Sequence, residues 1–312
     1  MTSFDRPLAG CVVNLSISES DDSARRGFPS RQVNRVTLQL VAALFGQGAG
    51  VVFGHDWRED GVMEAVYGFA RQMQPPIPLS AANAEGERQP LLRNLLPWPD
   101  TPHLPERDLE QLSSTLRVES AGLPAELQAL DDEARRVEHD HSLYRYIRAR
   151  GLTFLRHRLN GASHARLCLG GRHGGAAGRY PGVIEEALLA VRDNKPLYLA
   201  GFLGGATGQV IDAIEGKQMP DDFCRPTSLL RLYEEPPAKE FDARTLNDRI
   251  IDRDAIWKEF VEAGCARLVA TNGLSVEENH ALLHTPIIDQ VIELVLIGLS
   301  RLRREIAPRQ EM

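Results

Sequence analysis

Residues 167–192 read LCLGGRHGGAAGRYPGVIEEALLAVR, in which an apolar run, a glycine-rich turn and a helix follow one another. The apolar residues 167–169 suit a strand that is buried on both faces. Gly170 and Gly171 end this strand, because glycine readily adopts the positive φ angles of a tight turn. A strand that passes through such a turn into a helix predicts a ligand site beside the turn.

The helix after the turn is expected to begin near Pro181, since proline needs no backbone N–H in the first helical position. The unpaired N–H groups and dipole of this helix favour an anion, and two loop arginines add positive charge. We therefore expect a phosphate or nucleotide site here, with a purely structural glycine turn as the alternative. The predicted contact residues of the loop are Gly170, Gly171, Arg172, Gly178, Arg179, Tyr180, Pro181 and Gly182.

Glu185 and Glu186 fall in the first turn of this predicted helix. In that position they can simply complement the positive end of the helix dipole. Alternatively, one of them projects over the ligand as a hydrogen-bond acceptor to a ribose or as a catalytic carboxylate, because an acid beside a phosphate is otherwise unfavourable. The sequence leaves both interpretations open.

Two earlier segments repeat the order of strand, turn and helix. Residues 10–17 form one predicted strand, and residues 50–53 form another, which is followed by Gly54 and His55. The small polar residues at the end of the first strand are Ser16, Ser18, Glu19 and Ser20. They either meet a ligand at the carboxyl edge of the sheet or form a helix cap or turn. His55 is either a ligand contact or an ordinary surface group.

A further unit in residues 195–214 completes the alternation, again with glycines after its strand. Strands that alternate with helices in this way predict an α/β fold with a doubly wound, mainly parallel sheet and helices on both faces. Ligands bind such sheets in the crevice beyond the strand ends, at the point where the strand order reverses.

We assign residues 8–218 to the sheet core and residues 219–312 to a mainly helical C-terminal extension packed on that core. Residues 75–106 hold eight of the 19 prolines and are interpreted as a long irregular insertion that covers a pocket, meets a partner or is a solvated linker. Residues 112–118 are a further strand candidate. The amphipathic segment 287–304 packs on the sheet or forms a homodimer contact, and we expect a homo-oligomer.

Arg145 and Arg148 share one face of a predicted helix over residues 142–159, and either reach a phosphate in the crevice or stay solvated. His139 and His141 would project about 200° apart on a helix, so they cannot converge on one ion. The four cysteines also lack the spacing of a metal site. We therefore expect no metal and no cofactor.

The chain has 312 residues, of which 43% are hydrophobic, and its net charge is −7. This acidic balance argues against non-specific binding to nucleic acid, which needs a broad basic surface. The sequence lacks a run of about 18 apolar residues and the pattern of a signal peptide. We therefore expect a cytoplasmic protein that does not enter a membrane.

Three segments, LSISES (15–20), FGHDWREDGVMEA (53–65) and LGGRHGGAAGRYPGVIEEAL (169–188), together resemble the SLOG superfamily. This Rossmann-like group contains the Lonely Guy phosphoribohydrolases, the molybdenum-cofactor carrier proteins and sensor domains of prokaryotic defence proteins. With KPLYLAGFLGGATGQVIDAI (195–214) and TNGLSVEENHALL (271–283), the chain looks most like the TIR- and PNP-associating SLOG family.

In Lonely Guy enzymes the corresponding loop carries a proline, two glycines, a glycine-threonine pair and a glutamate, which an earlier arginine joins at the glycosidic bond. Gly170 and Gly171 match the glycine pair, and Glu185 or Glu186 matches the glutamate. Leu169 stands where those enzymes have the proline, and the loop has no glycine-threonine pair. These departures weaken the prediction of a hydrolase.

The resemblance implies a nucleotide-derived ligand that contains ribose and phosphate, such as ADP-ribose or a cyclic nucleotide. The first hypothesis is a sensor in a prokaryotic signalling or defence system, with a TIR or other effector protein as its partner. The alternative is an N-glycosidic nucleotide hydrolase in which Glu185 or Glu186 acts as the catalytic carboxylate. A structural protein with a vestigial crevice is the third hypothesis.

Overall fold

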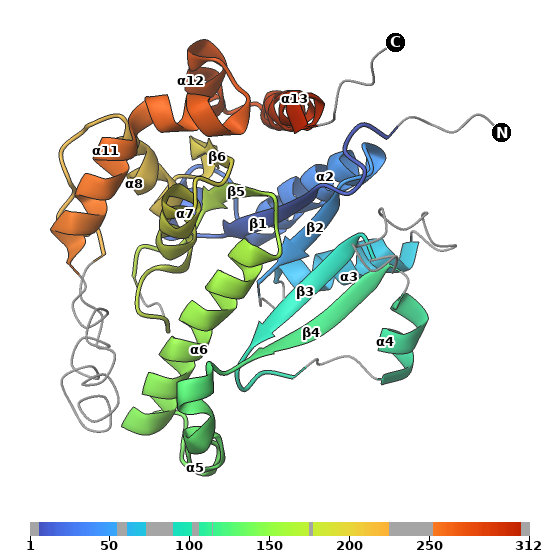
Figure 1. The fold of residues 1–312 in the computed structure, drawn as a ribbon, viewed down its shortest axis with the longest axis vertical. Coiled ribbons are helices and arrows are strands. Elements are labelled where there is room, and N and C mark those ends of the chain that lie inside the picture. Colours follow the sequence, from blue (N-terminus) through green and yellow to red (C-terminus); the bar gives the residue numbers. More distant parts are fainter. Residues whose placement is uncertain are drawn as a thin grey trace.

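The computed structural model describes residues 6–54, 61–72, 90–101, 106–113, 115–174, 177–224 and 252–306. Within these residues, parallel strands form a six-stranded sheet with the order β4-β3-β2-β1-β5-β6 (Figure 1). The strands are β1 (Val12–Ser18), β2 (Gly50–Phe53), β3 (Leu92–Pro97), β4 (Leu116–Gly122), β5 (Ala165–Gly170) and β6 (Leu197–Ala200). The predicted parallel α/β fold is confirmed.

Helices cover both faces of this sheet, and α6 lies in front of it in Figure 1. Those along the first two thirds of the chain are α1 (Asp21–Arg25), α2 (Ser30–Gly46), α3 (Val62–Gln72), α4 (Glu106–Leu112), η1 (Ala125–Leu130), α5 (Asp131–Arg136), α6 (Ser142–Gly161), α7 (Gly182–Arg192), η2 (Gly201–Leu203) and α8 (Gly205–Ile214). The C-terminal helices are α11 (Arg253–Asn272), α12 (Val276–His284) and α13 (Ile288–Ile306). Among the described helices, none has the length and apolar character that a membrane crossing requires.

The strand order reverses between β1 and β5. The chain builds the sheet outward from β1 to β4 and then returns through α6 to place β5 on the other side of β1. The register pairs Ser16 with Cys168 and Ser18 with Gly170, so the ends of these two strands lie side by side. The ends of β1 and β5 therefore flank the point at which doubly wound sheets bind ligands.

The interpretation of residues 75–106 as an irregular insertion is wrong for residues 92–97, which form β3 in the interior of the sheet order. Leu92, Leu95 and Leu96 are fully buried. Prolines surround this short apolar run and mask it in the sequence, but Pro97 is tolerated because the register with β4 shifts between Leu96 and Pro97, as at a β-bulge. Since α4 extends to residue 112, the next strand begins at Leu116 rather than at residue 112.

Apolar residues of the C-terminal helices join the cores on both faces of the sheet. Val291, Val295 and Leu299 of α13 belong to the core that α2 and α3 form with β1 and β2. Phe260 and Leu268 of α11 belong to the core that α7 and α8 form with β5 and β6. The C-terminal segment therefore contributes apolar surface that the sheet and its first helices would otherwise expose to water.

The contact between these helices and the edge strand β6 depends on a buried polar cluster. The side-chain amide of Asn272 donates to the backbone oxygen of Leu197 at 3.1 Å, and its carbonyl accepts the N–H of Leu274 at 3.0 Å. The Tyr198 hydroxyl donates to the backbone oxygen of Asn272 at 2.7 Å. Gly298 of α13 lies against this bond, because a Cβ atom at Gly298 would be 2.5 Å from the backbone oxygen of Asn272. The close approach of α13 to β6 thus requires glycine at this position.

A pair of glycine-to-alanine substitutions tests this approach. We expect Gly298→Ala to destabilise the protein by about 1–3 kcal/mol, because the new methyl group overlaps backbone that cannot easily move. Gly208→Ala in α8 is the matched control, since among the described residues no atom lies within 4 Å of a Cβ placed there. It should stabilise the protein by about 0.5–1 kcal/mol. Urea unfolding followed by circular dichroism measures both, and equal stability of the two variants would contradict the contact.

Candidate functional site

A cavity of about 340 Å³ lies at the carboxyl ends of β1 and β5. Its polar lining includes Ser16, Ser18, Arg148, Arg156, Arg172 and Glu186. Its apolar lining includes Leu15, Ile17, Phe53, Val62, Met63, Leu152 and Val183. Three arginines thus face one glutamate across a partly apolar space, which is the kind of environment that attracts an anion with an apolar part.

Arg166, the second residue of β5, organises the buried network behind the cavity, and its side chain is 0% exposed. Its Nη1 donates to Asn14 Oδ1 at 2.9 Å, to Ser16 Oγ at 2.7 Å and to Glu186 Oε2 at 2.6 Å. Its Nη2 donates to Asn160 Oδ1 at 3.3 Å. A buried guanidinium is tolerated only when it is paired and hydrogen-bonded, so Arg166 requires the Glu186 carboxylate at this place.

Glu186 connects this buried network to the cavity. Its Oε2 accepts hydrogen bonds from Arg166 and from the Ser16 hydroxyl. Its Oε1 lies 3.9 Å from Arg156 Nε, and its side chain is 14% exposed. The buried residues Arg166 and Ser16 therefore hold Oε2 of the carboxylate, while Oε1 remains on the side of Arg156.

Glu185 has a different place, although it is the adjacent residue. It is buried, accepts a hydrogen bond from Thr153 Oγ1 at 2.8 Å, and forms an ion pair with Arg156. Glu185 is not among the described lining residues, whereas Glu186 is. Of the two carboxylates left open by the sequence, Glu186 faces the cavity and Glu185 positions Arg156.

The glycines of the loop make room for protein atoms. A Cβ atom at Gly178 would lie 2.6 Å from Arg156 Nη1, and one at Gly182 would lie 3.0 Å from Arg156 Nη2. The Gly171 N–H donates to the backbone oxygen of Ser18 at 2.9 Å. Gly178 and Gly182 let the guanidinium lie against the loop, and the Gly171 N–H is already used within the protein rather than open to a phosphate.

A second cavity of about 590 Å³ shares Arg172 with the first. Glu19 and Ser20 also line it. Ser20 is the N-cap of α1, where its hydroxyl accepts the N–H of Ser23 at 3.1 Å, so the helix-cap interpretation is correct for this serine. Glu19 accepts a hydrogen bond from the Ser30 hydroxyl and lies 3.9 Å from Arg172.

Carboxylates give the second cavity a different electrostatic character. His173 lies between two of them, with Nε2 3.2 Å from Asp22 Oδ2 and Nδ1 3.2 Å from Asp222 Oδ2. Burial alone would raise the pKa of Asp22, but hydrogen bonds from Arg25 and from the Gly205 N–H, with the charge of His173, outweigh it and lower that pKa. The second cavity therefore suits hydrogen-bond donors better than it suits a second phosphate.

Cys168 lies in β5 near the buried network. Burial raises the pKa of its thiol to about 12. Since only the thiolate is a good nucleophile, this cysteine stays protonated and unreactive at neutral pH. The reactive potential of the cavity therefore resides in Glu186 and the arginines.

The structure brings together six of the residues predicted to contact a ligand. Those that line the first cavity are Ser16, Ser18, Gly54, Arg172, Gly182 and Glu186, while Glu19 and Ser20 line the second. Those outside both linings are Arg145, Gly170, Gly171, Gly178, Arg179, Tyr180, Pro181 and Glu185. His55 lies outside the described residues.

Sequence reasoning missed Arg156, Arg166 and Asn14, which position or line the site. Arg166 is the single charged residue of the otherwise apolar strand β5, and Asn14 alternates with Ser16 and Ser18 along β1, and these polar positions within strands were the available signal. Arg148 lines the cavity while Arg145 does not, because Arg148, Leu152 and Arg156 recur four residues apart along one face of α6.

A double-mutant cycle tests the buried pair. We expect Arg166→Met to destabilise the protein by about 3–5 kcal/mol, because it leaves the Glu186 carboxylate without its cation. The double variant Arg166→Met/Glu186→Gln should lose at least about 1 kcal/mol less stability than the sum of the losses of the two single variants. Arg192→Met is the matched control, since its pair with Glu259 at 2.6 Å is exposed and should contribute about 0–1 kcal/mol. Strict additivity in urea unfolding would contradict the pairing.

Comparison with known proteins agrees with this architecture. A family model described as SLOG cluster2 matches residues 7–282. The comparisons with curated proteins and with solved structures give no match. The narrower resemblance to the TIR- and PNP-associating SLOG family stays a prediction. Because the match spans most of the chain, the protein belongs to the SLOG cluster2 family, and this membership suggests a nucleotide-related function.

Proposed function

We propose that the cavity between β1 and β5 binds a nucleotide-derived ligand that contains ribose and phosphate, and that the protein acts as a sensor of this ligand. One observation carries the proposal: Glu186, held from below by fully buried Arg166, faces three arginines across one cavity. A carboxylate that accepts hydrogen bonds from hydroxyl groups, beside guanidinium groups that bind phosphate, is the combination that a sugar phosphate requires.

The arginines supply the phosphate end of this proposed site. Arg172 is the most accessible, with 53% of its side chain exposed, and its distance of 3.9 Å from Glu19 is long for an ion pair. Arg148 is held by Asp100 through two hydrogen bonds of 2.7 and 3.0 Å, and Arg156 is held by Glu185. Two arginines are thus preorganised, while the third can move onto an incoming phosphate.

Glu186 and the apolar wall supply the sugar and base end. Glu186 Oε1 would accept hydrogen bonds from ribose hydroxyls, while Phe53 and Met63 offer apolar surface. The volume of about 340 Å³ is at the lower end of the range of about 300–1,000 Å³ for ligand pockets. Because Arg172 also lines the second cavity, a larger ligand such as ADP-ribose would extend past it, whereas a cyclic nucleotide would fill the first cavity alone.

Sensing requires that binding change a contact with another molecule. In this proposal, the ligand shifts the protein between two arrangements by binding one of them more tightly. The readout is a second copy of the chain or an effector protein such as a TIR protein in a prokaryotic defence system.

A nucleotide panel tests binding. We expect ADP-ribose, NAD⁺, AMP or a cyclic nucleotide at about 1 mM to raise the melting temperature by several degrees, because a ligand at 100 times its Kd stabilises by about 2.7 kcal/mol. Arg172→Ala should weaken binding about 10- to 100-fold through loss of a charge-assisted contact. Arg136→Ala, at an exposed arginine of α5 outside both described linings, is the control. A melting temperature that no nucleotide changes would refute the proposal.

The 3.9 Å approach of Glu186 and Arg156 at the cavity favours a second candidate, N-glycosidic hydrolysis. In this reaction the carboxylate stabilises positive charge on the ribose or directs water to its anomeric carbon. The bond from that carbon to the base breaks, water supplies the new hydroxyl, and its proton leaves with the base. Arg156 would hold the phosphate.

Chromatography of nucleotides incubated with the protein distinguishes the two candidates. If the protein is a hydrolase, Glu186→Gln should reduce release of free base at least about 1,000-fold while binding changes only a few-fold, because the amide cannot supply the negative charge. Glu262→Gln, at an exposed glutamate of α11, is the control. Complete recovery of a nucleotide that demonstrably binds would exclude its hydrolysis and leave the sensor.

A further inference from the structure

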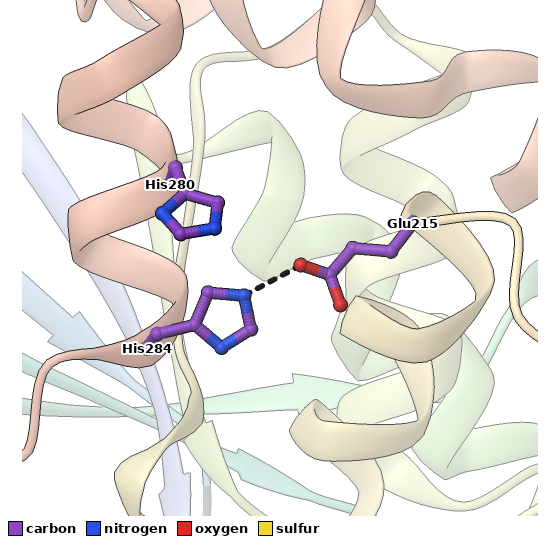
Figure 2. Close-up of side chains that lie close together, drawn as sticks. All are labelled: Glu215, His280 and His284. Carbon is purple, nitrogen blue, oxygen red and sulfur yellow. Dashed lines mark hydrogen bonds and ion pairs between the residues drawn. The ribbon is translucent and has the colours of Figure 1, made fainter.

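Two histidines of α12 and one glutamate at the end of α8 converge outside both cavities described above (Figure 2). His280 and His284 are four residues apart, so they project from the same face of α12, and their ring centroids are 4.7 Å apart. Glu215 is the C-cap residue of α8. One nitrogen from each histidine and one oxygen of Glu215 all lie within 4.8 Å of one another.

Contacts with neighbouring side chains hold the Glu215 carboxylate in place in the absence of a metal. Its Oε2 lies 2.8 Å from Lys217 Nζ, and its Oε1 lies 2.5 Å from His284 Nε2. The hydrogen bond with His284 holds the Glu215 carboxylate on the side of the histidines (Figure 2).

We propose that Glu215, His280 and His284 bind a divalent transition-metal ion, with Zn²⁺ as the expected occupant. Two imidazole nitrogens and one carboxylate oxygen are a ligand set found in zinc sites that keep a fourth position for water. Imidazole ligands select against Mg²⁺ and Ca²⁺, which take oxygen ligands. The site would differ from the nucleotide cavity in position and in chemistry.

The geometry requires only small side-chain movements. Tetrahedral bonds of about 2.0–2.1 Å place neighbouring donor atoms about 3.3 Å apart. The bond between His284 and Glu215 would open by less than 1 Å, with the metal replacing the shared proton, while the His280 ring would move inward. Both histidines are exposed, so their rotation displaces no core residue.

Such an ion would link two parts of the fold. Glu215 follows α8, whose apolar residues pack on β5 and β6, whereas both histidines belong to the C-terminal helices. Among the described residues, apolar contacts already join α8 to α11 and α12. The metal would act as a further cross-link that restricts separation of α12 from α8, and it would stabilise the folded chain by an amount that rises with the logarithm of its concentration above Kd.

Calorimetric titration of the untagged, full-length, metal-free protein with ZnCl₂ tests the site. We expect one Zn²⁺ per chain with a Kd of about 10 μM or lower. His280→Ala should weaken this binding at least tenfold without affecting folding, because His280 is exposed and the Glu215–His284 hydrogen bond remains. His157→Ala, at an exposed histidine of α6, is the matched control and should leave the affinity unchanged.

Two further readouts guard against adventitious binding. At the same Zn²⁺ concentration, the melting temperature of the wild-type protein and of His157→Ala should rise more than that of His280→Ala. Glu215→Gln should lower the affinity as His280→Ala does, because it removes the anionic ligand. Absence of binding up to about 100 μM Zn²⁺, or equal affinity of His280→Ala and the wild type, would overturn the proposal.

Discussion

The ion pair between Arg166 and Glu186 is the interaction on which the candidate site depends. A guanidinium that is fully buried inside a strand has a large desolvation cost, which only a close carboxylate and further hydrogen bonds can offset. Glu186 supplies that carboxylate from the beginning of the second turn of α7, and Asn14 and Ser16 complete the network from β1. The start of α7 must therefore face the point where β1 and β5 meet.

The same constraint explains why two adjacent glutamates have separate tasks. Successive residues of a helix point about 100° apart, so when Glu186 faces the sheet, Glu185 faces α6. There it pairs with Arg156 and accepts a hydrogen bond from Thr153, which ties α6 to α7. The guanidinium of Arg156 then lies against Gly178 and Gly182, so the path of the loop is adapted to this arginine.

The sequence was sufficient to predict the fold because its signals are local. Strands that end in glycine and continue into helices recur along the chain, and this repetition specifies a parallel sheet with ligands at the carboxyl ends. The same local rule failed for β3, because the prolines around Leu92–Pro97 outweighed its short apolar run. The carboxyl edge of the sheet was predictable from the turns that follow its strands. The interior strand β3, which no glycine turn follows, was not predictable in this way.

The candidate site was only partly predictable, because its decisive contacts join residues far apart in sequence. Ser16, Ser18, Arg172 and Glu186 were found from their positions after predicted strands. Whether Glu185 or Glu186 faces the cavity depends on the rotation of α7 relative to Arg166, which no spacing within residues 167–192 specifies. The loop glycines were assigned to a phosphate, but their closest neighbours are side chains and backbone that arrive from α6, α7 and β1.

Each arginine of the cavity already has a carboxylate partner, and this pairing bears on the proposed sensing. Arg148 is paired with Asp100, Arg156 with Glu185 and Arg172 with Glu19. A phosphate must compete with these carboxylates, and the exposed, 3.9 Å pair of Arg172 and Glu19 is the weakest competitor. Release of Glu19 would alter the boundary between the two cavities beside α1. The electrostatic design thus provides a physical route by which an anion in the first cavity changes a neighbouring surface.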